Sequence, residues 1–218
     1  LMADMGSPTV ATQRVDASVL FVDIVGFTSM SERHTPEEVV AMLNEYFSHF
    51  ILCSNLFFGS VDKFIGDCAM IVFGVPKPNP DHRLNAIACA VAIQRLLQRF
   101  REELPADSEQ LDIRVKIGIN SGEMMAGTVG AEDRIEYTVI GDAVNVASRL
   151  SDHAQADEIL AGETTVEHPS MKTRIQAHPA MKLPVKGKEE PITAYLIDSV
   201  TPEQQRVIDT FVEDLLSH

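Results

Sequence analysis

Residues 60–73 read SVDKFIGDCAMIVF, two apolar, β-prone runs on either side of Gly66 and Asp67. A short gap that holds Gly next to Asp between two such runs is a strong local signal for a tight hairpin. The pattern therefore predicts a hairpin with Asp67 at its tip and Lys63 a few residues back along the first strand.

A second carboxylate has a similar setting earlier in the chain. Residues 18–25 read SVLFVDIV, an apolar strand pattern interrupted only by Asp23. An unpaired carboxylate in such a run is costly, so Asp23 needs a partner. Two acidic groups on rigid β-elements suit hard divalent cations, which prefer oxygen ligands. The plainer alternative is that Asp23 ends a strand and Asp67 serves only the turn, where aspartate is common.

The composition narrows the class of protein. The chain of 218 residues is long enough for one large domain or two small ones. Its net charge of −14 argues against a nucleic acid or an anionic membrane as the main partner. Cys53, Cys68 and Cys89 are scattered through apolar stretches and predict reduced core residues of a cytoplasmic domain. No apolar run approaches about 18 residues, so we expect no membrane span.

The order of strand and helix signals predicts an α+β fold, in which helices cover a largely antiparallel sheet. Residues 111–120 (LDIRVKIGIN) alternate as a strand does, and Ser121-Gly122 predicts a turn into a second hairpin arm at 123–129. A helix signal follows Gly141 and runs to about His153.

The chain divides into three expected parts. Residues 1–14 resemble a linker or an expression remnant, residues 15–200 form the main domain, and residues 201–218 form an amphipathic helix. That helix opens on a capping signal at Thr201-Pro202. We expect it to pack on the domain or to lead into a flanking one.

Five stretches resemble, in order and spacing, the motifs of the class III adenylyl cyclase catalytic domain: FVDIVGFTSMSE, VDKFIGDCAMIVFG, GINSGEMMAGTVG, YTVIGDAVNVASRL and LPVKGKEEP. The resemblance covers roughly residues 15–200. It implies the ferredoxin-like class III nucleotidyl cyclase fold and a head-to-tail homodimer. It also implies conversion of ATP to 3′,5′-cyclic AMP and pyrophosphate, at sites that take metal ligands from one subunit and nucleotide contacts from the other.

The resemblance implies that Asp23 and Asp67 are the metal pair, with the Ile24 carbonyl as a further ligand. Two Mg²⁺ or Mn²⁺ ions per site would lower the pKa of the ribose 3′-hydroxyl and hold the triphosphate. Carboxylate ligands favour these ions over zinc.

Further motif residues match phosphate and ribose contacts of the family. Asn145 matches the asparagine that orients the ribose, and Arg149 matches the arginine that steadies charge at the α-phosphate. Lys186 matches a late triphosphate-binding lysine.

The loop after Asp23 offers a second phosphate contact. Gly26, Phe27 and Thr28 enter a helix and offer backbone N–H groups to the phosphates. The alternative for these three residues is ordinary turn and cap chemistry.

Base recognition falls to Lys63 and Thr138 in this comparison. Lys63 matches the lysine of adenylyl cyclases, where guanylyl cyclases typically carry an acidic residue. Thr138 stands where many members have Asp; its hydroxyl can also accept from the adenine amino group. The Thr subtype resembles the branch that includes bicarbonate-responsive cyclases, so bicarbonate is a candidate activator.

Three alternatives stay open at this point. A guanylyl cyclase is disfavoured by Lys63, and a diguanylate cyclase lacks its GG(D/E)EF signature here. A catalytically silent nucleotide-binding or dimerisation module is disfavoured because all five expected side chains are present: Asp23, Lys63, Asp67, Asn145 and Arg149. We expect regulatory domains to flank the catalytic domain in the full-length protein.

Overall fold

The computed structural model describes residues 12–103, 113–131, 134–184 and 190–217. Its elements are, in chain order, β1 (Gln13–Ile24), α1 (Phe27–Ser31), α2 (Pro36–Leu56), β2 (Gly59–Ile65), β3 (Cys68–Phe73), α3 (His82–Glu103), β4 (Val115–Ala131), β5 (Arg134–Ile140), α4 (Asp142–His153), β6 (Ile159–Gly162), α5 (Glu163–Val166), a 3₁₀ turn (Pro169–Met171), β7 (Ile175–Leu183), β8 (Ile192–Val200) and α6 (Pro202–Leu216).

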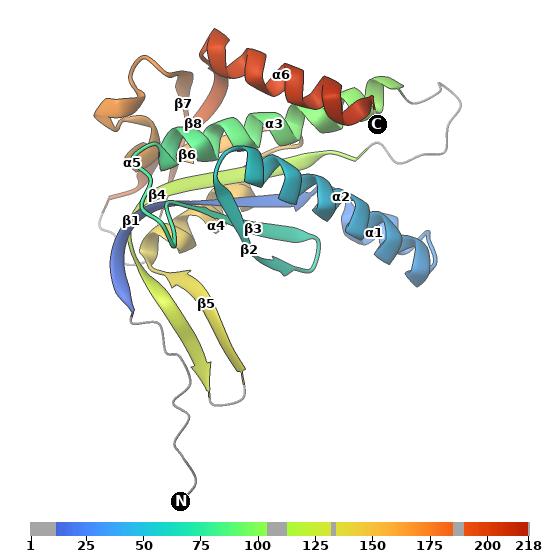
Figure 1. Cartoon of the computed structure of the whole chain (residues 1–218), viewed down its shortest axis with the longest axis horizontal. Helices are drawn as coiled ribbons and strands as arrows, with labels where there is room; N and C mark the ends of the chain where they lie inside the picture. The colour runs from blue at the N-terminus through green and yellow to red at the C-terminus, as the bar shows by residue number, and fades with distance from the viewer. Residues whose placement is uncertain (1–11, 104–112, 132–133, 185–189, 218) are drawn as a thin grey trace, which may run out of the picture.

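Within those ranges the strands form one eight-stranded sheet (Figure 1). The strand order is β2-β3-β1-β4-β6-β8-β7, and β5 pairs with β4 off this path. β4 and β6 are parallel, whereas the other pairs are antiparallel. The prediction of an α+β fold with a largely antiparallel sheet is confirmed.

The two faces of the central strand β1 meet different helices, because side chains alternate along a strand. Leu20 and Val22 pack in the core that β1 shares with α2 and α3. Val19 and Phe21 pack in a second cluster with α4 on the opposite face. Asp23, two residues beyond Phe21, therefore lies on the α4 side. Figure 1 shows α3 over the first face, with α6 on the outer side of α3.

A close backbone approach at Gly118 sets α4 against β4. A Cβ atom at this position would collide with the backbone nitrogen of Ser151 and the backbone oxygen of Ala147. Glycine is thus required for α4 to lie this close to the sheet. The approach brings the end of α4 beside the end of β1.

The predicted hairpin at residues 60–73 is confirmed. β2 ends at Ile65, β3 starts at Cys68, and the two strands pair in antiparallel register. Gly66 adopts a φ of 63°, the left-handed conformation that favours glycine. Asp67 lies in the turn, as predicted.

The predicted turn at Ser121-Gly122 is wrong. β4 runs unbroken from Val115 to Ala131, because β1 pairs with it continuously from Gln13↔Ala126 to Ile24↔Val115. The hydroxyl of buried Ser121 lies 2.6 Å from that of Ser18 and 2.9 Å from that of Thr165. These buried contacts and the long ladder override the local turn signal.

The described part of the chain opens with strand β1 and closes with helix α6. β1 begins at Gln13, two residues before the expected start of the domain at residue 15, and residues 1–11 lie outside the described ranges. Thr201 caps α6 by accepting from the Gln204 N–H, and Ile208 and Val212 of α6 are buried in the α3 core. None of the helices in the described part of the chain is both long and apolar enough to cross a membrane.

The cysteines follow the prediction of core positions in two cases. Cys53 and Cys89 are buried, and burial raises the pKa of Cys53 to about 12. Cys68 is half-buried instead, because it directly follows the hairpin turn and borders a hollow beside Asp67.

Candidate active site

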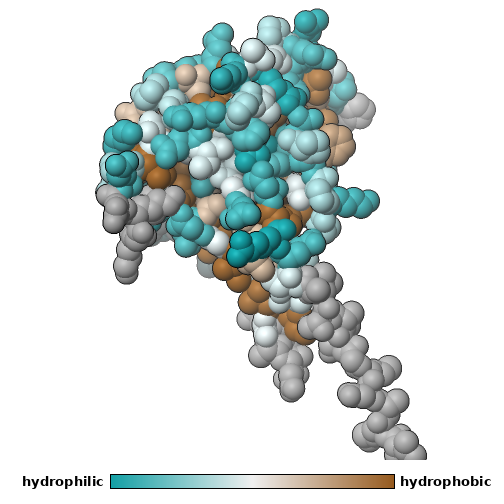
Figure 2. All heavy atoms as spheres, turned by 90° about the vertical axis from the view of Figure 1, so that its left-hand side faces the viewer, coloured by the Kyte–Doolittle hydropathy of each residue, from teal (hydrophilic) through white to brown (hydrophobic). Residues whose placement is uncertain are grey.

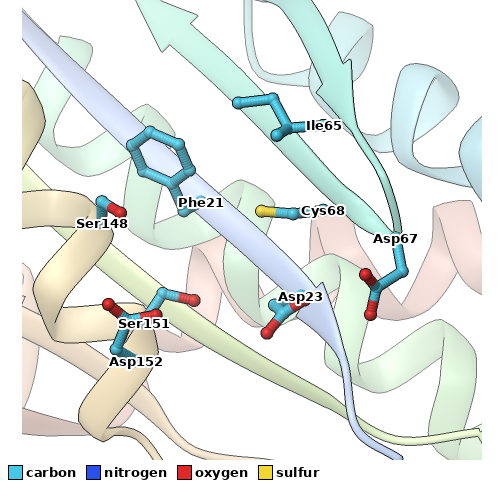
Figure 3. A pocket seen from close by; sticks show the side chains of 8 residues that line it. All are labelled: Phe21, Asp23, Ile65, Asp67, Cys68, Ser148, Ser151 and Asp152. Atoms are coloured by element: carbon cyan, nitrogen blue, oxygen red, sulfur yellow. The ribbon is translucent and has the colours of Figure 1, made fainter. Parts of the chain in front are cut away.

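The structure brings Asp23 and Asp67 together. Asp23 pairs across the sheet with Cys68, the residue that follows Asp67. Both aspartates line one pocket between β1, the β2–β3 turn and α4, and Figure 3 shows their side chains at the same end of it. Burial, and then the neighbouring carboxylate of Asp23, raise the pKa of Asp67. Two carboxylates in this arrangement favour a bound cation.

Lys116 of β4 supplies a positive charge at the same place. It lies opposite Asp23 in the β1–β4 ladder, and its Nζ is 3.0 Å from Asp23 Oδ2. Both side chains are about a quarter exposed, at 24% for Lys116 and 23% for Asp23. Lys116 could not be predicted as a site residue, because nothing local in LDIRVKIGIN shows which residue of another strand lies opposite it.

A second hollow, of about 440 Å³, is also lined by the two aspartates. Its lining includes Ile24, Gly26, Phe27 and Thr28, together with Asp23, Asp67 and Lys116. Gly26 precedes α1 with a φ of 75° and lets the chain leave β1 and enter this short helix directly. The predicted phosphate loop therefore borders the predicted metal pair.

Lys63 and Thr138 line a separate hollow of about 370 Å³, whose other walls include apolar side chains such as Met70 and Val144. Lys63 Nζ lies 3.3 Å from Glu136 Oε2 and 3.4 Å from Asp62 Oδ2. Thr138 Oγ1 donates to the same Asp62 oxygen at 2.8 Å. Both base-recognition candidates thus share a carboxylate that the sequence analysis did not single out.

Asn145 and Arg149 lie on α4, one helical turn apart, as predicted. Asn145 is exposed, and Arg149 Nη1 donates to the backbone oxygen of Pro184 at 3.2 Å. The pocket at Asp23 receives other residues of α4: Ser148, Ser151 and Asp152. Lys186 lies outside the described residues.

Residues 10–199 match the family described as Adenylate and Guanylate cyclase catalytic domain. The chain belongs to this family. The resemblance noted in the sequence is therefore confirmed at the level of the class III cyclase catalytic domain.

Curated relatives of this cyclase domain include two named adenylate cyclases. One is Adenylate cyclase 1 of Rhizobium meliloti, 33% identical over 87% of this chain and 28% of its own length. The other is the adenylate cyclase of Anabaena cylindrica, 38% identical over 82% of this chain and 36% of its own length. The chain thus spans about a third of the length of these relatives.

Solved structures confirm the cyclase fold. The adenylyl cyclase CyaB from P. aeruginosa matches with a TM-score of 0.81 and 31% identity, over 88% of this chain and 98% of that one. The guanylyl cyclase Cya2 matches with a TM-score of 0.80 and 30% identity, over 88% and 96%. One of these neighbours is an adenylyl cyclase and the other a guanylyl cyclase, so similarity of the fold does not show which nucleotide this domain uses.

The donor set of this cyclase domain fits a divalent metal held jointly with a substrate. Within the described ranges, no group of three or more His, Cys, Asp or Glu side chains is placed to hold a metal ion. Asp23 and Asp67 supply two carboxylates, and Ile24 lines the same hollow. Mg²⁺ commonly binds through one or two carboxylates plus substrate phosphates, so two aspartates beside a phosphate loop suit it.

Proposed function

We propose that this domain is an adenylyl cyclase, which converts ATP to 3′,5′-cyclic AMP and pyrophosphate. The observation that carries the proposal is the meeting of Asp23 and Asp67 at one pocket, next to the loop of Gly26, Phe27 and Thr28. In this proposal the carboxylate pair binds the metal ions and the backbone N–H groups of the loop bind the phosphates, which supports attack of the 3′-hydroxyl on the α-phosphate.

Asp23, Asp67 and the Ile24 carbonyl would hold two Mg²⁺ or Mn²⁺ ions per site. When bound, the ions would lower the pKa of the ribose 3′-hydroxyl and neutralise the triphosphate. Asp23 must exchange its ion pair with Lys116 for the metal, and Lys116 at the edge of the hollow can then face the phosphates.

The remaining groups position the nucleotide. Arg149 would stabilise charge at the α-phosphate, Asn145 would orient the ribose, and Lys186 would bind the triphosphate. Lys63 and Thr138 would contact the purine, in a hollow whose apolar walls suit a flat base.

We propose that the working unit is a head-to-tail homodimer, with each site shared between subunits. Asn145 and Arg149 do not line the pocket of Asp23 and Asp67 within one protomer, so a second copy is the natural source of them. Four apolar side chains on β4 and β5 are also exposed: Met125, Val129, Ile135 and Ile140. Figure 2 shows hydrophobic surface, in brown, where the molecule projects from its main body. Such a cluster is typical of an interaction surface.

Two further proposals concern control. The relatives are about three times longer than the matched domain, which supports flanking regulatory domains in the full-length protein. The proposal that bicarbonate is an activator rests on Thr138 alone. A dose–response assay with bicarbonate at constant pH tests it, and an unchanged rate of cyclic AMP formation would refute it.

The central experiment is product analysis with ATP and with GTP, each in Mg²⁺ and in Mn²⁺, over a range of protein concentrations. We expect cyclic AMP from ATP, a lower yield of cyclic GMP from GTP, and a specific activity that rises with protein concentration as dimers form. Cyclic GMP as the main product would establish the guanylyl alternative, and no product from either nucleotide would favour the silent module.

A further inference from the structure

We propose that Asp62 is a positioning residue that sets the nucleotide preference: its carboxylate accepts the hydrogen bond of the Thr138 hydroxyl and so leaves only the lone pairs of that hydroxyl for the base. The inference rests on the proposed cyclase function and concerns its base-recognition hollow. It assigns a role to a side chain that does not itself need to touch the nucleotide.

A bulge in β2 places Asp62 where it can act. The β2–β3 register shifts between Val61 and Lys63, so Asp62 is the extra residue of this strand. In a regular strand the side chains of Asp62 and Lys63 would point to opposite faces. Here both side chains reach β5: Asp62 Oδ2 lies 2.8 Å from Thr138 Oγ1, and Lys63 Nζ lies 3.3 Å from Glu136 Oε2.

The contact is shielded from water. The side chain of Asp62 is 4% exposed, and Thr138 is 8% exposed. Lys63, at 34%, closes the carboxylate from the solvent side with its Nζ 3.4 Å from the same oxygen. A hydrogen bond in such surroundings is stronger than one in water, so the orientation of the hydroxyl is well defined.

The direction of this hydrogen bond follows from the chemistry of its partners. An ionised carboxylate only accepts, so Thr138 must donate to it. A hydroxyl has one proton and two lone pairs, and this proton is used. Towards the hollow that Thr138 lines, the hydroxyl can then offer only acceptor positions.

An acceptor at this place discriminates between purines. Adenine presents an amino donor at the position where guanine presents a carbonyl acceptor. Thr138 held by Asp62 therefore receives a hydrogen bond from adenine and faces an acceptor in guanine. Together, Thr138 and Asp62 supply the hydrogen-bond acceptor for the adenine amino group that an Asp at position 138 would supply alone.

The test compares the unmodified protein with Asp62→Asn. The amide can donate its own N–H to Thr138 Oγ1, which frees the hydroxyl proton to meet the guanine carbonyl. We expect the ratio of kcat/KM for ATP to that for GTP to fall roughly tenfold. This is the change expected when one hydrogen bond between the protein and the base turns from favouring adenine to favouring guanine. Glu123→Gln removes an exposed carboxylate of β4 that pairs with Arg14, and is the matched control expected to keep the ratio.

Binding without turnover gives an independent readout. Calorimetry with 3′-deoxy-ATP and 3′-deoxy-GTP, which lack the attacking hydroxyl, should show the same shift in relative affinity for Asp62→Asn. If Asp62 had only a structural role, Asp62→Asn would lower the affinity for both ligands by the same factor. In a Thr138→Val background, Asp62→Asn should change the ratio no further, because the two residues act as one unit.

The outcomes separate this inference from the function on which it rests. If the unmodified protein prefers ATP and Asp62→Asn shows the same ATP-to-GTP ratio, the role of Asp62 is refuted but the adenylyl cyclase assignment stands. An unmodified protein that prefers GTP, or binds neither, overturns the adenylyl assignment and this inference with it. If Asp62→Asn fails to fold, Thr138→Ser and Thr138→Val decide: the serine should keep the ATP preference and the valine should lose it, and equal ratios in both would refute the inference.

Discussion

Lys116 and Asp23 lie opposite each other in the β1–β4 ladder and form an ion pair, with Nζ 3.0 Å from Oδ2. The same carboxylate belongs to the pair that would hold metal with Asp67. The lysine therefore offsets one of the two negative charges, and it would compete with a cation for Asp23. The charge of Asp23 would thus be balanced in one of two ways, by Lys116 or by a metal ion.

Replacing Lys116 by Met should shift that balance. We expect lower thermal stability without metal, by about 1 kcal/mol because the pair is partly exposed, and a several-fold gain in apparent affinity for Mn²⁺. Thermal unfolding at increasing Mn²⁺, without nucleotide, measures both effects. A weaker metal response in Lys116→Met than in the unmodified protein would show that the lysine supports the metal site.

Asp67→Ala should abolish metal-dependent turnover and leave the fold intact. Asp67 lies in a turn and carries no core packing, whereas the lost metal contact removes several kcal/mol of transition-state stabilisation, on the order of a thousandfold in rate. The rate of cyclic AMP formation measures the loss of turnover, and the midpoint of unfolding shows whether the fold is intact. Asp198→Ala, at an exposed aspartate of β8, is the control for loss of a surface carboxylate. Retained activity in Asp67→Ala would refute the metal assignment.

Two inactive variants should complement each other if the sites are shared between subunits. Lys63 and Asp67 are proposed to serve different sites of one dimer, so a Lys63→Ala/Asp67→Ala heterodimer keeps one intact site. After full exchange we expect about a quarter of the unmodified rate, since half of the dimers are mixed and each has one working site of two.

The complementation assay needs proof that subunits exchange, for example by energy transfer between labelled copies. Complete exchange without recovered activity would contradict the shared site. Recovery at a concentration too low for dimers would contradict it equally.

The sequence predicted those features that local signals specify. The hairpin around Gly66 and the cap at Thr201 were foreseen because turn and cap residues act on their own neighbours. The unbroken course of β4 through Ser121 was not foreseen, because pairing with β1 decides it. Long-range register outweighs a two-residue turn signal.

The candidate site divides in the same way. The likeness of motifs identified Asp23, Asp67, Lys63 and Thr138, and the structure places them in two pairs. Asp62 was overlooked, although it stands next to Lys63 in the sequence. A regular strand would have turned it to the opposite face, and a bulge is visible only once the register with the neighbouring strand is known.

Buried His82 should make stability depend on pH. Its Nδ1 lies 2.8 Å from Ser18 Oγ, and its Nε2 faces Arg83 Nη1 at 2.8 Å and Asp16 Oδ2 at 3.6 Å. Burial, followed by the charge of Arg83, lowers the pKa of His82 below its ordinary 6.5, although Asp16 opposes this and His168 adds to it. Folding therefore favours the neutral form of this ring over the charged form.

The sign of the effect follows from proton linkage. Below pH 6.5 the unfolded chain binds a proton at His82 that the folded protein does not yet accept, so the free energy of unfolding should fall with decreasing pH until the folded pKa is reached. Denaturant unfolding between pH 5 and 8 measures this slope. His82→Gln cannot titrate and should flatten the slope, even if it lowers stability at every pH through lost hydrogen bonds. An equal slope in His82→Gln would assign the pH dependence to other groups.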